Sequence, residues 1–206
     1  MRTIRRVRLS AVLVLASLSA ALAGCAEDSD LSSEEDARRA YLGLDGSIEK
    51  TLDLGMAGFN EASSANIPTQ NGQGDVSGTI TIDGQVDQGA SDNKGLRLTV
   101  ALADYSDGPA ETVEDDDIDI TYDTDPARLP EVDLTLRNIP DGTLEGTLLG
   151  TYEMRGDIEG TATLDLTISG TIEDDGDGGV SRMPGNTHVT GVARSGDATF
   201  EIDVMI

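Results

Sequence analysis

The chain has 206 residues, of which 14 are Lys or Arg and 39 are Asp or Glu, and its formal net charge is −25. This negative field repels polyanions, and basic residues cluster only near the N-terminus, so nucleic-acid binding is excluded. A single cysteine and a single histidine exclude a disulfide framework and a zinc site built from several His or Cys ligands.

The first 24 residues have the composition of an export signal. Four arginines lie within residues 2–8, an apolar stretch covers residues 9–23, and small residues precede Cys25. The apolar stretch is too short for a membrane-spanning helix, which needs about 20 apolar residues. The alternative is an ordinary secretory signal cleaved after Ala23, which would leave a lone reactive cysteine in an oxidising compartment.

The quartet Leu22-Ala23-Gly24-Cys25 resembles the lipobox of bacterial lipoproteins. The resemblance implies cleavage before Cys25, lipid on its sulfur and acylation of the new amino terminus, which would hold the chain at a membrane of the cell envelope. Some Gram-negative lipoproteins carry an aspartate after the cysteine that retains them at the inner membrane. Ala26 stands there in this chain, so the outer membrane is expected if the source has one.

Removing residues 1–24 leaves 10 basic against 39 acidic residues, a net charge of −29. Membrane attachment must then come from lipid, because anionic headgroups repel such a chain. An acidic surface with only two lysines, Lys50 and Lys94, resembles that of salt-adapted proteins, and simple solubility is an equally good explanation. In both cases stability should rise with salt or divalent cations, because counterions screen the repulsion.

Residues 25–35 are acidic and almost free of apolar side chains, which predicts a disordered tether. Residues 36–62 then show the apolar spacing of an amphipathic helix. Its stripe consists of Tyr41, Leu44, Ile48, Leu52, Met56 and Phe59. Four glycines weaken this helix by up to ~1 kcal/mol each, so it needs a surface to lie on, and small residues allow a close approach.

Residues 63–74 predict a linker, and residues 75–206 predict an antiparallel β domain in which apolar and polar residues alternate. The alternation falls into eight runs: 75–87, 96–104, 113–123, 132–139, 143–154, 157–172, 187–193 and 198–206. Three of the expected inward rows are Val76/Ile80/Ile82, Leu96/Leu98/Val100/Leu102 and Ile158/Ala162/Leu164/Leu166/Ile168. The fourth is Phe200/Ile202/Val204/Ile206.

Recurring Gly-Thr dipeptides place five glycines on the apolar rows: Gly78, Gly146, Gly150, Gly160 and Gly170. Glycine within a strand often marks a bend or a close backbone approach. We therefore expect a mainly β fold with one N-terminal helix, a curved meander of about eight strands forming an open barrel or half-barrel. The helix would pack on the concave apolar face, where these glycines admit it. Compositional bias toward Gly and Thr is the alternative explanation.

Two acidic clusters are the candidate metal sites. One contains Asp115, Asp116 and Asp117, and the other Asp174, Asp175 and Asp177. Calcium takes six to eight oxygen ligands from flexible loops. The second cluster begins like an EF-hand loop but lacks its later ligands and closing glutamate, so a looser calcium site or a solvated acidic loop remain the two alternatives.

No catalytic constellation is evident, and we expect no enzymatic activity and no cofactor other than the covalent lipid. His188 lies within a predicted strand, and no Gly-x-Ser-x-Gly elbow presents a nucleophile. Arg155-Gly156-Asp157 matches the tripeptide that some adhesion receptors recognise, but its composition is also typical of a hairpin turn, which is the structure predicted here.

The sequence thus favours a lipid-anchored envelope lipoprotein that acts as a non-enzymatic binding or structural module. Its partners would be the membrane, through the anchor, and an envelope protein or a divalent cation. The alternatives are a periplasm-facing carrier of a lipid or other apolar ligand, motivated by the glycine-lined hollow, and a Ca²⁺-stabilised surface interaction protein. An enzyme that uses carboxylates alone is a weaker alternative.

Overall fold

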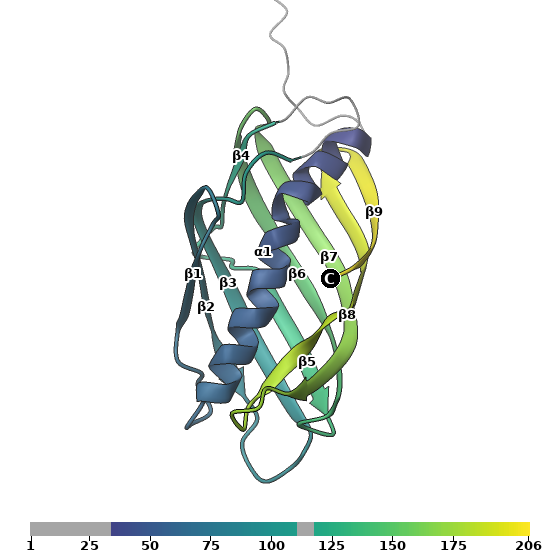
Figure 1. Ribbon diagram of the computed structural model, residues 1–206. Coiled ribbons are helices and arrows are strands. Elements are labelled where there is room, and N and C mark those ends of the chain that lie inside the picture. Colours follow the sequence, from purple (N-terminus) through teal and green to yellow (C-terminus); the bar gives the residue numbers. More distant parts are fainter. Residues whose placement is uncertain (1–33, 111–117) are drawn as a thin grey trace, which may run out of the picture.

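The structure is a computed structural model and describes residues 34–110 and 118–206. Within these residues the fold is one N-terminal helix packed on a sheet of nine antiparallel strands, as Figure 1 shows. The elements are α1 (Glu34–Glu61), β1 (Gln70–Gln73), β2 (Ser77–Val86), β3 (Lys94–Ser106), β4 (Ile120–Asp123), β5 (Glu131–Arg137), β6 (Gly142–Gly156), β7 (Gly160–Asp174), β8 (Val180–Ser195) and β9 (Ala198–Met205).

The sheet is an open meander in the order β1-β2-β3-β4-β6-β7-β8-β9, with β5 paired to β3 and β6. β4 and β5 therefore share one lane between β3 and β6, at opposite ends of that lane. The edge strands β1 and β9 are not paired with each other in this order, so the described sheet is not a closed barrel. The prediction of a mainly β fold with one N-terminal helix on a curved antiparallel sheet is confirmed.

Helix α1 covers the inner face of the sheet and runs diagonally across it (Figure 1). It contacts β8 and β9 toward one edge and β1 and β2 toward the other. The predicted stripe is buried, with Tyr41, Leu44, Ile48, Leu52 and Met56 at most 3% exposed, and Phe59 packs against the same core. In a closed barrel the strands themselves would enclose the apolar interior. In this open sheet the helix shields that interior from water instead.

Close approach between helix and sheet depends on glycines of the helix. A Cβ added to Gly43 would collide with the ring of Tyr122, whose hydroxyl donates to the Ala40 carbonyl over 3.0 Å. At Gly55 it would meet the side chain of Leu98, a residue of β3. These contacts confirm that the small residues of α1 let the sheet come close.

The strand glycines have a different role from the one expected. Gly146, Gly150 and Gly170 lie on the inner rows, but a Cβ there would meet Asp133, Pro130 and Asn186 respectively, all in the sheet or its loops. None of these contacts is with α1. The expectation that they admit the helix is wrong, because their missing side chains relieve crowding between neighbouring strands of the sheet itself.

Three of the four inward rows are buried or partly buried as predicted, and the first is only partly correct. Ile80 and Ile82 are fully buried, but Val76 is 69% exposed. Gly78 has a φ of 72°, and the register with β3 shifts between Ser77 and Thr79. This bulge breaks the two-residue period, so Val76 faces solvent.

The segment expected as a linker, residues 63–74, contains the edge strand β1. Its four residues pair with β2, and Asn66 forms an isolated bridge with Gln85. The described helix begins at Glu34, so Glu34 and Glu35, expected in the tether, belong to its first turn. Acidic residues there are favourable beside the positive end of the helix dipole.

A first prediction concerns Gly43→Ala, a change that raises the helix propensity of α1. We expect overpacking of about 1–3 kcal/mol against the buried Tyr122 ring to exceed the propensity gain of at most ~1 kcal/mol, so the variant should unfold at lower urea. Urea unfolding followed by circular dichroism measures the difference. Tyr122→Phe serves as the second arm of a double-mutant cycle. In the Tyr122→Phe background, Gly43→Ala should lower the free energy of unfolding by less, because the hydroxyl group nearest to the added Cβ is gone. A stabilised Gly43→Ala protein would contradict the proposed close packing.

Candidate binding surface

Cys25 and the cluster Asp115, Asp116 and Asp117 lie outside the described residues. They stay sequence-based expectations.

The second acidic cluster forms the turn between β7 and β8, and its carboxylates close that turn. Asp175 accepts hydrogen bonds from the amides of Asp177 and Gly179 at 2.9 and 2.8 Å. Asp174 accepts one from the Gly176 amide at 2.7 Å. Among the residues that the structure describes, no three His, Cys, Asp or Glu side chains are grouped so that they could hold a metal ion. Asp174 and Asp175 have a structural role, because their carboxylates accept hydrogen bonds from the backbone amides of the turn.

Salts offer a direct test of this turn. We expect NaCl to raise the melting temperature, because screening relaxes repulsion among the carboxylates. Equal concentrations of CaCl2 and MgCl2 should act alike, since Asp174 and Asp175 already accept hydrogen bonds from backbone amides. The measurement is thermal unfolding in the three salts, with Asp177→Asn as the comparison variant. A rise specific to calcium that Asp177→Asn abolishes would instead support the calcium-stabilised alternative.

Two other sequence candidates are engaged in local pairs. His188 lies on the outer face of β8, and its Nε2 is 2.6 Å from a carboxylate oxygen of Asp203 on β9. In the hairpin between β6 and β7, the guanidinium of Arg155 lies 3.3 Å from Asp123. Asp157 accepts a hydrogen bond from the Asp119 amide at 2.9 Å. The adhesion tripeptide is thus engaged in sheet contacts through both of its charged side chains.

Sequence reasoning missed a buried arginine that ties α1 to β8. The side chain of Arg182 is 6% exposed; its Nε donates to Asp53 of α1 at 2.9 Å, and its Nη2 lies 2.7 Å from the same carboxylate oxygen. Nη1 also donates to the Thr187 hydroxyl at 3.2 Å. No local sequence pattern signals this pair, because Arg182 and Asp53 are 129 positions apart.

The end of α1 is fixed to the same strand by an amide side chain. Asn60 donates to the Val180 carbonyl and accepts from the Val180 amide, both at 2.9 Å. The side chain thereby replaces a neighbouring strand at the start of β8. Together with Arg182, it holds the C-terminal half of α1 on the sheet.

Lys50 holds the opposite flank of α1. Its ammonium group donates to Asp75 at 2.8 Å and to Asp107, and it lies 5.5 Å from the ring centre of Tyr105. Tyr105 also donates to Asp107 at 2.6 Å. Burial alone would raise the pKa of Asp107, but the hydrogen bonds from Lys50 and Tyr105 outweigh burial and hold that pKa below its ordinary value.

This cluster predicts a specific acid sensitivity. A carboxyl group with a depressed folded-state pKa contributes stability above its unfolded pKa, about 4, and that contribution is lost as pH falls through the lower folded value. Asp107→Asn should cost about 1–3 kcal/mol at neutral pH. The difference from wild type should shrink steadily below about pH 4.

Urea unfolding across this pH range measures the effect. Asp133→Asn, an exposed change on β5, is the matched control and should leave stability nearly unchanged. A gap between wild type and Asp107→Asn that stays constant with pH would rule out the assignment.

A recess lies on the outer face of the sheet, where the position that β4 and β5 share between β3 and β6 is interrupted. β4 ends at Asp123 opposite Glu153, and β5 begins at Glu131 opposite Leu149. Thr124 and Pro130 still bond to the backbone of β3, residues 125–129 leave the lane, and Pro130 packs where a Gly150 side chain would lie. The three residues of β6 between the two pairings, 150–152, thus border a break in the sheet.

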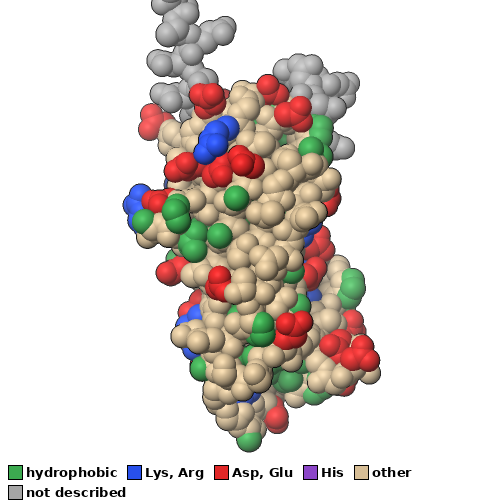
Figure 2. Space-filling model, turned by 90° about the vertical axis from the view of Figure 1, so that its left-hand side faces the viewer, with side chains coloured by type: hydrophobic (Ala, Val, Ile, Leu, Met, Phe, Trp, Pro, Cys, Tyr) green, Lys and Arg blue, Asp and Glu red, His purple; other side chains and the backbone are tan. Residues whose placement is uncertain are grey.

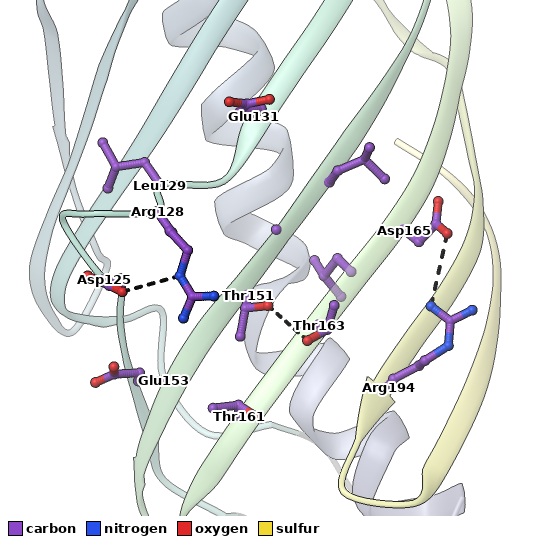
Figure 3. A pocket seen from close by; sticks show the side chains of 13 residues that line it. Asp125, Arg128, Leu129, Glu131, Thr151, Glu153, Thr161, Thr163, Asp165 and Arg194 are labelled. Carbon is purple, nitrogen blue, oxygen red and sulfur yellow. Dashed lines mark hydrogen bonds and ion pairs between the residues drawn. The ribbon is translucent and has the colours of Figure 1, made fainter.

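Beside this break lies a groove of about 480 Å³, which we call the outer groove. Arg128 reaches into it from the loop and Arg194 from β8, with Thr151 and Thr163 between them, as Figure 3 shows. The two threonine hydroxyls are 2.9 Å apart. Arg128 lies 3.6 Å from Asp125, and Arg194 lies 4.0 Å from Asp165, so both ion pairs are long. The groove therefore presents loosely held charges on either side of a hydroxyl pair.

Comparisons with protein-family models, with curated proteins and with solved structures gave no match. Over residues 34–110 and 118–206, no helix is both long and apolar enough to cross a membrane.

Proposed function

We propose that this chain is a lipid-anchored, non-enzymatic binding module of the cell envelope, attached through Cys25. The observation that carries the proposal is the filled inner face: α1 occupies the hollow of the sheet, which leaves the outer face for partners. The lipobox-like quartet supplies the attachment. The outer membrane is the proposed location if the source has one.

The filled hollow weighs against the carrier alternative. Tyr41, Ile48 and Leu52 are at most 1% exposed and occupy the space that an apolar ligand would need. The glycines that suggested a hollow relieve crowding within the sheet instead. The carrier hypothesis has thereby lost the observation that motivated it.

The burial pattern favours binding over catalysis. In the described residues, the buried polar and charged side chains are Ser47, Thr51, Ser106, Arg182, Thr187 and Ser195. None of these is a carboxylate, whereas acid catalysis by carboxylates alone relies on a buried carboxyl group whose pKa is raised. Asp107, a partly buried carboxylate, has its pKa shifted in the opposite direction.

The acidic surface limits which partners can bind. Acidic side chains are scattered over the face at the β1–β2 side, with few Lys or Arg among them, as Figure 2 shows. Long-range repulsion would keep anionic partners away, and a cationic or neutral partner could approach. The module would thus select its partners by exclusion of anions before any contact is made.

The anchor is tested by Cys25→Ser. We expect wild-type protein from bacterial membranes to partition into detergent and to carry acyl groups on its N-terminal residue, as mass spectrometry would show. Cys25→Ser should instead be recovered in the aqueous phase, because each buried lipid methylene contributes about 0.8 kcal/mol to membrane attachment. Ala26→Ser is the matched control and should keep the lipid. An unacylated wild-type terminus, or a variant that stays in the membrane, would overturn the proposal.

A further inference from the structure

We infer that the outer groove binds a neutral, polyhydroxylated ligand, a short stretch of glycan. The inference deepens the proposed function, because it names the ligand class of that module. It rests on the chemistry of the groove and on its place at the break in the sheet.

The two arginines of the groove have donors to spare. The guanidinium groups of Arg128 and Arg194 form only the long ion pairs at 3.6 and 4.0 Å, and neither guanidinium donates a hydrogen bond to another described residue. Arg182 offers the contrast, since its guanidinium is occupied by Asp53, Glu49 and Thr187. A guanidinium carries five N–H donors in a fixed fork, so the groove arginines can each receive two neighbouring ligand oxygens.

Acceptors surround the same space. Glu131 and Glu153 line the groove beside Asp125 and Asp165, and Thr151 can both donate and accept (Figure 3). A ligand that satisfies these groups must itself offer donors and acceptors at short intervals. The vicinal hydroxyl groups of a sugar have this property, since each hydroxyl both donates and accepts.

The charges of the lining argue for a neutral ligand. The groove has four carboxylates and two guanidinium groups, and the whole chain is strongly negative, so an anionic ligand is repelled. A polycation would have to approach the two arginines that stand on opposite sides of the hydroxyl pair. A neutral ligand avoids both penalties.

The size and the apolar part of the groove fit a small oligosaccharide. A volume of about 480 Å³ lies within the range of small-molecule sites. Leu149 is 50% exposed at its border and offers an apolar contact for the C–H face of a sugar ring. The groove lining contains no aromatic side chain for stacking, so we expect a Kd of about 1–10 mM. Many anchored copies on one membrane would convert weak single contacts into firm attachment.

The test is saturation-transfer NMR on the full-length protein in perdeuterated detergent, with chitotriose and maltotriose as probes. We expect transfer from the protein to at least one trisaccharide. Preference for chitotriose would indicate an amino-sugar polymer such as that of a cell wall, and preference for maltotriose a plain hexose polymer. Both outcomes support the inference.

The variants isolate the groove. Thr151→Val and Arg194→Gln should each reduce the transfer at least fivefold. Thr147→Val is the matched control, because Thr147 faces Thr167 in the same pair of strands outside the groove. Arg137→Gln is the second control, because Arg137 has an equally long and exposed pair with Glu145. Both controls should bind as wild type does.

The inference is overturned if neither trisaccharide shows transfer, if the groove variants bind as wild type does, or if spermidine or a basic peptide displaces the sugar. Unchanged circular dichroism and melting temperatures establish that the variants are folded. Because the readout is independent of Cys25 acylation, failure here is distinguishable from failure of the anchor proposal.

Discussion

The fold depends on one packing constraint: an open, curved sheet has an apolar inner face that its own strands do not enclose. Helix α1 covers that face with Tyr41, Leu44, Ile48, Leu52 and Met56, each worth roughly 1.5–3 kcal/mol on burial. The dependence is mutual, because a helix with four glycines would be marginal alone. Gly43 and Gly55 on the helix, rather than Gly146, Gly150 and Gly170 on the strands, let the helix approach the sheet closely.

The distribution of charge follows from this packing. Polar groups near the interior serve to hold the helix: Arg182 pairs with Asp53 on one flank, and Lys50 bridges Asp75 and Asp107 on the other. The outer face carries exposed ion pairs, which contribute about 0–1 kcal/mol each, and those of Arg128 and Arg194 are long. Charges that add little to stability are available for recognition, and the outer groove gathers several of them beside a hydroxyl pair.

Local periodicity explains why so much of the architecture was predictable. The two-residue alternation located β2 to β9, and the spacing from Tyr41 to Phe59 located α1. β1 was not predicted, because Gln70–Gln73 contains no apolar residue that would show the alternation of a strand. The outer groove could not be predicted from the sequence, because it depends on non-local strand pairing. The sequence pattern shows β4 and β5 only as two separate strands. Their pairing with β3 and β6 places them in one interrupted lane. The Arg182–Asp53 pair likewise joins residues that no local pattern connects.

The placement of α1 also governs how the chain can fold. Its main contacts are with β8 and β9, which lie far along the sequence. When the chain emerges N-terminus first, the helix must therefore wait with its apolar stripe uncovered until those strands arrive. Non-local contacts of this kind slow folding and prolong the lifetime of aggregation-prone intermediates with exposed apolar surface. A chain with this design depends on the negative charge of its own sequence to remain unaggregated during that interval.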